Sequence, residues 1–161
     1  MMDTSRLIYL HGSDSNSNSG KARLFRQWFP GMLTPDFSGP FEERMAQLHT
    51  ILSDHTGWTL IGSSYGGLMG TIFTLDYETR VRKLILLAPA LTFNPLASLP
   101  NPKPVSVPTI LIHGTLDTVV PPKPVREVAQ RLFTNLTCIT VEDDHRLGKS
   151  VHELDWNTIL A

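Results

Sequence analysis

The sequence has 161 residues, of which 41% are hydrophobic and 18% charged, with a formal net charge of −1. This length predicts one domain, residues 1–161, with a core large enough to fold without disulfides. The near-neutral charge, without basic or acidic blocks, favours neither nucleic acid nor an anionic membrane as a partner. Cys138 is the single cysteine, which rules out an internal disulfide and favours a reducing cytoplasm. The start lacks a signal-peptide layout, and the longest apolar run, Leu84–Leu91, is too short to span a bilayer.

The first half of the chain alternates apolar runs with amphipathic stretches. Residues 6–10 predict a strand that leads into a polar, turn-rich loop. Residues 20–29 carry apolar side chains at helical spacing, as do residues 41–54, so both predict helices. Between these two predicted helices, the stretch "MLTPDF" has room for a short strand broken by Pro35.

The second half begins with the predicted strand "WTLIG" and a broadly apolar helix over residues 65–77. Three further apolar runs, "KLILLA", "TILIH" and "TCITV", are typical of strands buried on both faces of a parallel sheet. Between the last two, residues 125–133 have the pattern of an amphipathic helix. The last predicted helix covers residues 148–160. The five prolines of residues 94–108 predict an irregular excursion over the edge of the sheet.

This order of elements predicts the fold class. Repeated alternation of strands and helices is typical of an α/β protein, with a mostly parallel sheet and helices on both faces. In such sheets, ligands bind beyond the carboxyl ends of the strands. We therefore expect the functional residues in the loops that follow strands.

One of these loops carries a pattern with a known mechanical cause. Residues 62–66, "GSSYG", match G-x-S-x-G, in which a strand turns sharply into a helix and exposes a serine hydroxyl. Only Ser64 occupies the serine position. Gly62 and Gly66 fit because side chains at these places would collide across the turn. The pattern predicts a nucleophile on a strained turn, although an inert serine in a glycine-rich turn would have the same sequence.

Two later loops supply partners for such a serine. Asp117 follows the strand "TILIH", where a carboxylate can hold an imidazole in the required tautomer, or can simply stabilise its own turn. His145 follows the last predicted strand, where a general base would be needed. Asp143 and Asp144 are alternative partners for this imidazole. Neighbours in sequence seldom reach the same ring nitrogen well, so we favour Asp117.

Acyl transfer would also need donors for the developing oxyanion. The backbone N–H of the residue after the nucleophile, Tyr65, is one predicted donor. The second donor comes from the loop after an earlier strand, where the N–H of Ser13 is the best candidate. The neighbouring His11 is expected to pack at the strand end and order this loop.

Five segments together resemble a known family: "IYLHGSDSNSNSGKA", "LIGSSYGGL", "LILLAPAL", "LIHGTLDTVVP" and "DDHRL". They resemble the α/β-hydrolase superfamily, and specifically the short YqiA-like esterases, although Ser13 stands where those esterases often carry a bulky residue. The resemblance implies Ser64 as nucleophile, Asp117 as orienting acid and His145 as base, in the chain order of the superfamily. It also implies a three-layer α/β/α sandwich with a mostly parallel, six-stranded sheet in the order 4-3-5-6-7-8 and no full cap domain.

The sequence therefore predicts a carboxylesterase-like serine hydrolase that acts on small soluble esters or thioesters through an acyl-enzyme, without a cofactor. No spacing of histidine, cysteine and carboxylate residues resembles a zinc site. Leu91, Phe93 and Leu96 are expected to form an apolar patch for a short acyl chain. Two alternatives are an acyltransferase or lyase that uses the same site, and a catalytically silent binding protein with the same fold.

The sequence also supports predictions for three other side chains. His113 is expected to pack at a strand end, with a place in the lining of the site as the alternative. Lys21 is expected to be solvated, with attraction of an anionic substrate as the alternative. Cys138 is predicted to lie in the core because it falls inside a strand.

Overall fold

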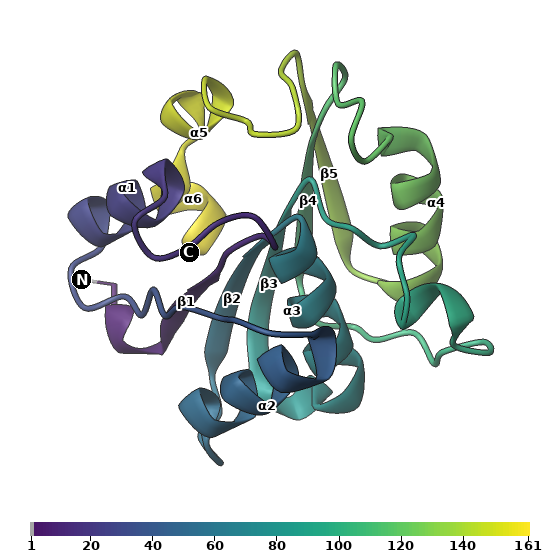
Figure 1. The fold of residues 1–161 in the computed structure, drawn as a ribbon, viewed down its shortest axis with the longest axis horizontal. Helices are drawn as coiled ribbons and strands as arrows, with labels where there is room; N and C mark the ends of the chain where they lie inside the picture. The colour runs from purple at the N-terminus through teal and green to yellow at the C-terminus, as the bar shows by residue number, and fades with distance from the viewer. Residues whose placement is uncertain (1) are drawn as a thin grey trace.

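The computed structural model of the protein describes residues 2–161, and its centre is a five-stranded sheet (Figure 1). The strands lie side by side in chain order, and every neighbouring pair is parallel. They are β1 (Leu7–Leu10), β2 (Trp58–Ser63), β3 (Val81–Leu87), β4 (Thr109–Gly114) and β5 (Leu136–Val141). The helices are α1 (Gly20–Trp28), α2 (Phe41–Leu52), α3 (Tyr65–Asp76), α4 (Pro122–Leu132), α5 (Ser150–Glu153) and α6 (Trp156–Leu160).

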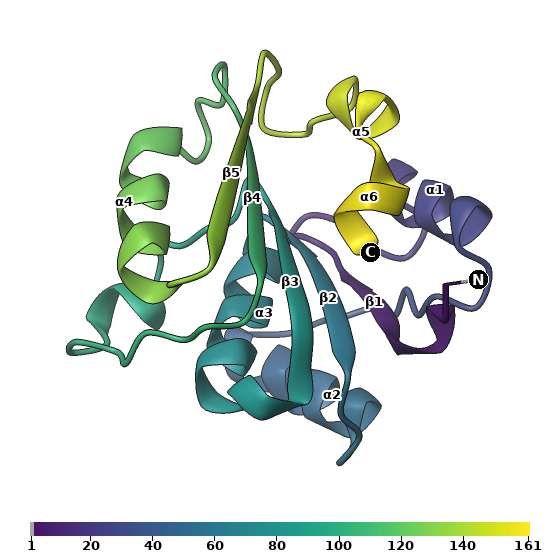
Figure 2. The ribbon, with the colours of Figure 1, turned by 180° about the vertical axis from the view of Figure 1, so that it is seen from behind.

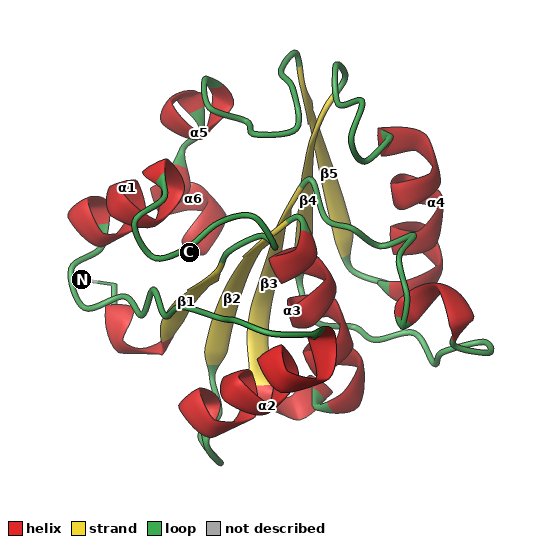
Figure 3. Ribbon diagram, in the orientation of Figure 1, coloured by secondary structure: helices red, strands yellow, loops and turns green. Residues whose placement is uncertain are grey.

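Helices cover both faces of the sheet, as the rear view and the colouring by secondary structure show (Figures 2 and 3). One face packs against α2, α3 and α4, and the other against α1, α5 and α6. Along β2, Leu60 faces the first group and Ile61 the second; Leu84 and Ile85 of β3 divide in the same way. Successive side chains of a strand point to opposite faces, so a continuous apolar run fills both cores. The predicted α/β class is confirmed.

The sheet has five strands, and the prediction of six was wrong. The segment expected to form the additional strand makes a single bridge, between Leu33 and Ile8. Tyr9 donates to the Leu33 carbonyl and Leu33 donates to the Leu7 carbonyl, each at 2.9 Å. The next residue of this segment in position to donate to β1 is Pro35, which has no N–H. The ladder therefore ends after one residue.

The helix predicted over residues 148–160 is divided into α5 and α6. Asp155 lies between the two helices, and its side chain accepts a hydrogen bond from the Thr158 N–H at the start of α6. This cap begins a new helix where the sequence analysis predicted one continuous helix. The other predicted helices are confirmed with shifts of one or two residues at their C-terminal ends, and α4 begins three residues earlier than predicted. Within residues 2–161, no helix combines the length and the apolar character needed to cross a bilayer.

The proline-rich segment, residues 94–108, is irregular apart from a short 3₁₀ turn, Leu96–Ser98. The prediction that this segment runs over the edge of the sheet was wrong. Val105 donates to the Leu132 carbonyl at the end of α4, and Leu96 packs in the core that α2, α3 and α4 cover. The segment therefore belongs to the helical layer on that face.

Cys138 is exposed on β5, so the prediction that it lies in the core was wrong. β5 is the edge of the sheet and pairs only with β4. Side chains along β5 are either exposed or half-buried, and none is fully buried. An apolar run is thus buried in a central strand but only partly covered in an edge strand.

Candidate active site

Ser64 occupies a strained turn between β2 and α3. Its φ is 55° and its ψ is −114°, a conformation that non-glycine residues rarely adopt and that costs about 1–3 kcal/mol. Backbone hydrogen bonds hold the turn: the Ser64 N–H donates to the Leu87 carbonyl, and the Ser64 carbonyl accepts from Ala90, both at 2.9 Å. Residues at the end of β3 therefore fix the position from which the Ser64 side chain projects.

The two glycines of the pattern are required by contacts across this turn. A Cβ on Gly62 would lie 2.5 Å from the Gly66 carbonyl oxygen. A Cβ on Gly66 would lie 2.0 Å from the Leu10 carbonyl oxygen of β1. Both distances are far inside van der Waals contact, so any side chain would push α3 away from the sheet. The predicted collision explains Gly62, and the contact with β1 adds a reason for Gly66 that the pattern did not reveal.

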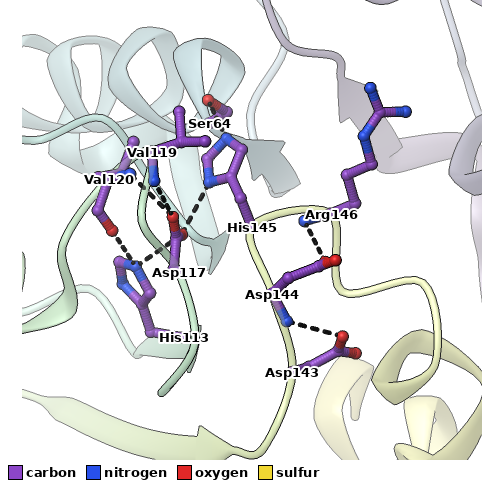
Figure 4. Close-up of polar contacts among 9 residues, drawn as sticks. All are labelled: Ser64, His113, Asp117, Val119, Val120, Asp143, Asp144, His145 and Arg146. Atoms are coloured by element: carbon purple, nitrogen blue, oxygen red, sulfur yellow. Dashed lines mark hydrogen bonds and ion pairs between the residues drawn. The ribbon is translucent and has the colours of Figure 1, made fainter.

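Ser64, Asp117 and His145 come together at the carboxyl ends of β2, β4 and β5 (Figure 4). The Ser64 Oγ lies 3.0 Å from His145 Nε2, and His145 Nδ1 lies 2.7 Å from Asp117 Oδ2. The Asp117 side chain is fully buried, whereas that of His145 is 19% exposed. With Nδ1–H donated to the carboxylate, Nε2 is left as an acceptor for the serine proton.

The carboxylate of Asp117 is held ionised by its surroundings. Its Oδ1 accepts hydrogen bonds from the backbone N–H groups of Val119 and Val120, at 2.9 and 2.8 Å. Burial alone would raise the pKa of this carboxyl, but the hydrogen bonds from Val120 and His145 together with the charge on His145 lower it below the ordinary value. Asp117 therefore presents a fixed negative charge to the imidazole.

The two alternative acids do not contact the imidazole. Asp143 accepts hydrogen bonds from the backbone N–H groups of Asp144 and Ser150, at 2.8 and 2.9 Å. Asp144 accepts from the backbone N–H of Arg146 at 3.0 Å. Both carboxylates thus order the loop that carries His145, and the acid bonded to His145 is Asp117.

A second histidine, His113 at the end of β4, also contacts Asp117. Its Nε2 lies 3.1 Å from Asp117 Oδ2 and 2.8 Å from the Val120 carbonyl oxygen. Because both partners accept, Nε2 must carry a proton that they share. The ring is buried, and its Nδ1 has no hydrogen-bond partner. The sequence predicted packing for this residue; the contact with Asp117 was missed, although the spacing of four residues between the two was visible.

Two free backbone donors lie beside Ser64. Tyr65 begins α3, and its N–H has no carbonyl partner in the described part of the chain, as expected for the first residue of a helix. The N–H of Ser13 likewise has no backbone partner within residues 2–161. A Cβ on the preceding Gly12 would lie 3.5 Å from the Ser64 Cβ, so this loop runs directly past the serine. Ser13 and Ser64 line the same two clefts, and the role of the two N–H groups as oxyanion donors stays a prediction.

His11 orders the loop that contains Ser13. Its Nδ1–H donates to the Gly12 carbonyl at 2.7 Å, and its Nε2 accepts from the Phe37 N–H at 2.9 Å. The ring is buried and both nitrogens are used. The predicted structural role for this side chain is confirmed.

Two clefts meet at Ser64, and each also contacts Ser13, Asp14, His145 and Arg146. The first, here called the α1 cleft, has a volume of about 340 Å³ and is further lined by residues including Ser15, Ser19, Lys21, Leu24, Val151 and His152. The second, the β4 cleft, has a volume of about 390 Å³ and is further lined by Tyr65, Ala90, Phe93, Thr118, Val119, Val120 and Asp144. Clefts of this size suit small molecules.

The expected acyl patch is only partly present. Phe93 is 47% exposed and lines the β4 cleft, as predicted. Leu91 and Leu96 are buried in the core and do not reach Ser64, so their inclusion was wrong. Within residues 2–161, no cluster of three or more histidine, cysteine or acidic side chains could hold a metal ion.

A parallel sheet with a strained serine turn after β2, an acid after β4 and a histidine after β5 defines an α/β hydrolase. The model of the family described as "Serine hydrolase (FSH1)" matches residues 3–153, and the chain belongs to this family. The resemblance to the α/β-hydrolase superfamily is thereby confirmed. The matching family is FSH1, whereas the sequence suggested the YqiA-like esterases.

Solved structures show the same fold over most of the chain. Mouse alpha/beta hydrolase domain-containing protein 10 is 22% identical with a TM-score of 0.75, and the match covers 96% of this chain and 90% of that one. A hydrolase of the alpha/beta superfamily from Xanthomonas campestris is 25% identical with a TM-score of 0.77, covering 94% and 93%. An esterase from Pyrococcus furiosus is 18% identical with a TM-score of 0.70, covering 96% and 79%. No curated protein sequence matches the chain.

Proposed function

We propose that the protein is a carboxylesterase that cleaves small esters or thioesters through an acyl-enzyme on Ser64. The observation that carries this proposal is the unbroken hydrogen-bonded series from Ser64 Oγ through His145 to the buried Asp117 carboxylate. Membership of a serine hydrolase family supports it. The esterase from Pyrococcus furiosus shares the fold and is consistent with this chemistry.

The first half of the reaction forms the acyl-enzyme. His145 Nε2 takes the proton of Ser64 Oγ as the oxygen attacks the ester carbonyl carbon. Asp117 stabilises the resulting imidazolium. The N–H groups of Ser13 and Tyr65 bind the oxyanion, a contribution of about 3–4 kcal/mol per donor. The bond to the leaving alcohol or thiol then breaks, and His145 gives it the proton.

The second half returns the enzyme to its resting state. His145 takes a proton from water as the water oxygen attacks the acyl carbon. The new oxyanion uses the same two donors. The bond from the acyl carbon to Ser64 Oγ breaks, Ser64 recovers its proton from His145, and the acid is released.

The proposal is tested by covalent labelling with a fluorophosphonate, followed by intact-protein and peptide mass spectrometry. We expect one adduct on Ser64 in the wild type, none in Ser64→Ala, and strongly slowed labelling in His145→Ala. His55→Ala is the matched control, because this exposed histidine lies outside the site and its loss should leave labelling unchanged.

A folded wild-type protein that takes up no label would contradict the proposal and favour a binding protein that lacks turnover. A parallel assay follows release of the acid from a short ester. Loss of the ester without release of acid, with the acyl group recovered on an added alcohol, would instead support an acyltransferase. Both results separate the alternatives with the same preparation.

A further inference from the structure

The α1 cleft contains two cationic side chains that form no ion pair with any residue of the described chain, residues 2–161. Lys21 lies in the first turn of α1, and Arg146 directly follows His145. Both line this cleft beside Ser64. Within residues 2–161, neither the ammonium of Lys21 nor the guanidinium of Arg146 forms a hydrogen bond or an ion pair (Figure 4 shows the Arg146 side chain directed away from the carboxyls of Asp143 and Asp144).

The surroundings of Lys21 disfavour the positive charge of its ammonium. Burial lowers the pKa of the Lys21 ammonium, and the positive charge of Arg146 lowers it further. Asp144 and Asp143 act in the opposite direction but are too distant to form an ion pair, and the net effect is a lowered pKa. A partly buried cation without a partner is unfavourable, so an anion that enters this cleft would relieve that cost.

The remaining lining of the α1 cleft fits a small polar anion. Ser15 and Ser19 contribute hydroxyls, and Leu24 and Val151 give the wall an apolar part. Asp14 is the only carboxylate among the described lining residues, and it is exposed to solvent. Its charge is therefore well screened compared with that of the half-buried Lys21.

The β4 cleft, on the other side of Ser64, has a different character. Phe93 and Val119 are exposed apolar side chains on its wall, and Val120 adds a buried one. Arg146 and Asp14 line both clefts, whereas Lys21 lines only the α1 cleft and Asp144 only the β4 cleft. A substrate that spans Ser64 would thus meet more positive than negative side chains on one side, and on the other side exposed apolar side chains with more negative than positive ones.

From this asymmetry, we propose that the substrate is an ester or thioester with an anionic group, a carboxylate or a phosphate, which Lys21 and Arg146 bind in the α1 cleft while an apolar group occupies the β4 cleft. This inference rests on the proposed esterase function. It assigns Lys21 a role in substrate specificity, which the sequence analysis gave as the alternative to a solvated lysine.

The test compares esters that differ only in charge. One pair has butyrate esterified to 4-hydroxybutanoate or to the neutral 4-hydroxybutanamide, which places the anion on the leaving alcohol. A second pair, ethyl hemiglutarate and its neutral amide, places it on the acyl side. Butyrate esterified to 3-hydroxypropyl phosphate replaces the carboxylate by a phosphate. Each ester is assayed with wild type, Lys21→Met and the control Lys123→Met, a lysine on α4 outside both clefts.

We expect kcat/KM to be about tenfold higher for an anionic ester than for its neutral partner, from one charge-assisted hydrogen bond. Lys21→Met should abolish most of this preference, mainly through KM, while the neutral esters and the Lys123→Met control change little. The pair with the larger ratio identifies the half of the substrate that enters the α1 cleft, and the phosphate ester identifies the anion.

Equal or faster hydrolysis of the neutral esters by wild type would overturn this inference and leave the esterase function intact. The same holds if Lys21→Met slows neutral and anionic esters alike. Failure of wild type to hydrolyse any of the five esters or to take up a fluorophosphonate would overturn the proposed function itself, and this inference with it. The wild-type comparison does not depend on the folding of any variant.

Discussion

At the scale of single residues, His113 and His145 both donate to the same carboxylate oxygen of Asp117. With two backbone donors on the other oxygen, Asp117 accepts four hydrogen bonds while fully buried. Each donor withdraws some of the negative charge that would otherwise act on the imidazole of His145. His113 is therefore a positioning residue in the proposed mechanism, because it acts through Asp117 and does not touch Ser64.

Replacement of His113 tests this role. In His113→Phe, which keeps a ring of similar size, Asp117 loses one donor and its charge acts more fully on His145. The imidazolium is then more stable, so the acidic limb of the kcat/KM profile should move to higher pH, because only neutral His145 accepts the serine proton. Asp117 also loses one of the hydrogen bonds that fix its orientation toward His145. We therefore expect kcat to fall by roughly tenfold, far less than the ~10⁴ known for loss of the acid in such sites.

The pH profile separates positioning from mere packing. A variant that is only less stable would show lower thermal stability with the acidic limb unmoved. Wild-type values of both kcat and this limb in His113→Phe would show that the bond to Asp117 has no influence on the site. The exposed His55 again supplies a control, since His55→Phe should move neither quantity.

At the scale of elements, the sharp turn from β2 into α3 depends on the close approach of α3 to β1. In Gly66→Ala the new Cβ would lie 2.0 Å from the Leu10 carbonyl oxygen, in a part of the backbone that cannot move without parting β1 from α3. We expect the free energy of unfolding to fall by at least about 2 kcal/mol, measured by urea denaturation. Gly20→Ala is the matched control, because nothing lies within 4 Å of a Cβ there. Equal effects of the two substitutions would show that the turn tolerates a side chain.

The elements also show which parts of the fold were predictable. Central strands and amphipathic helices were predicted because each carries its own hydrophobic pattern. Ser64, Asp117 and His145 were singled out because each follows a strand. The short strand expected in "MLTPDF" is reduced to a single bridge at Leu33, and its length was not predictable because it depends on which N–H groups face β1. The break at Asp155 and the exposure of Cys138 depend on a capping contact and on the position of β5 at an edge. His113 was missed because its contact with Asp117 arises only when the loop after β4 closes.

At the scale of the whole molecule, the candidate site lies at the carboxyl edge of the sheet with two clefts of about 340 and 390 Å³ open beside it. Clefts of this volume suit small molecules better than extended lipid chains. In a series of p-nitrophenyl esters, we expect kcat/KM to be highest for acetate and butyrate and to fall for laurate and palmitate. Highest values for the long chains would show that the exposed Phe93 belongs to a larger apolar surface than these clefts indicate.

The hydroxyl, carboxylate and imidazole follow β2, β4 and β5, and Ser64 and His145 are 81 positions apart along the chain. The Ser64 hydroxyl is therefore activated only when the edge strand β5 is paired with β4, whereas much of the apolar core packs against β1, β2 and β3. Labelling of Ser64 would consequently report on the integrity of the C-terminal edge. During gentle denaturation, reactivity should disappear with the pairing of β4 and β5, even where tryptophan fluorescence still indicates an intact interior.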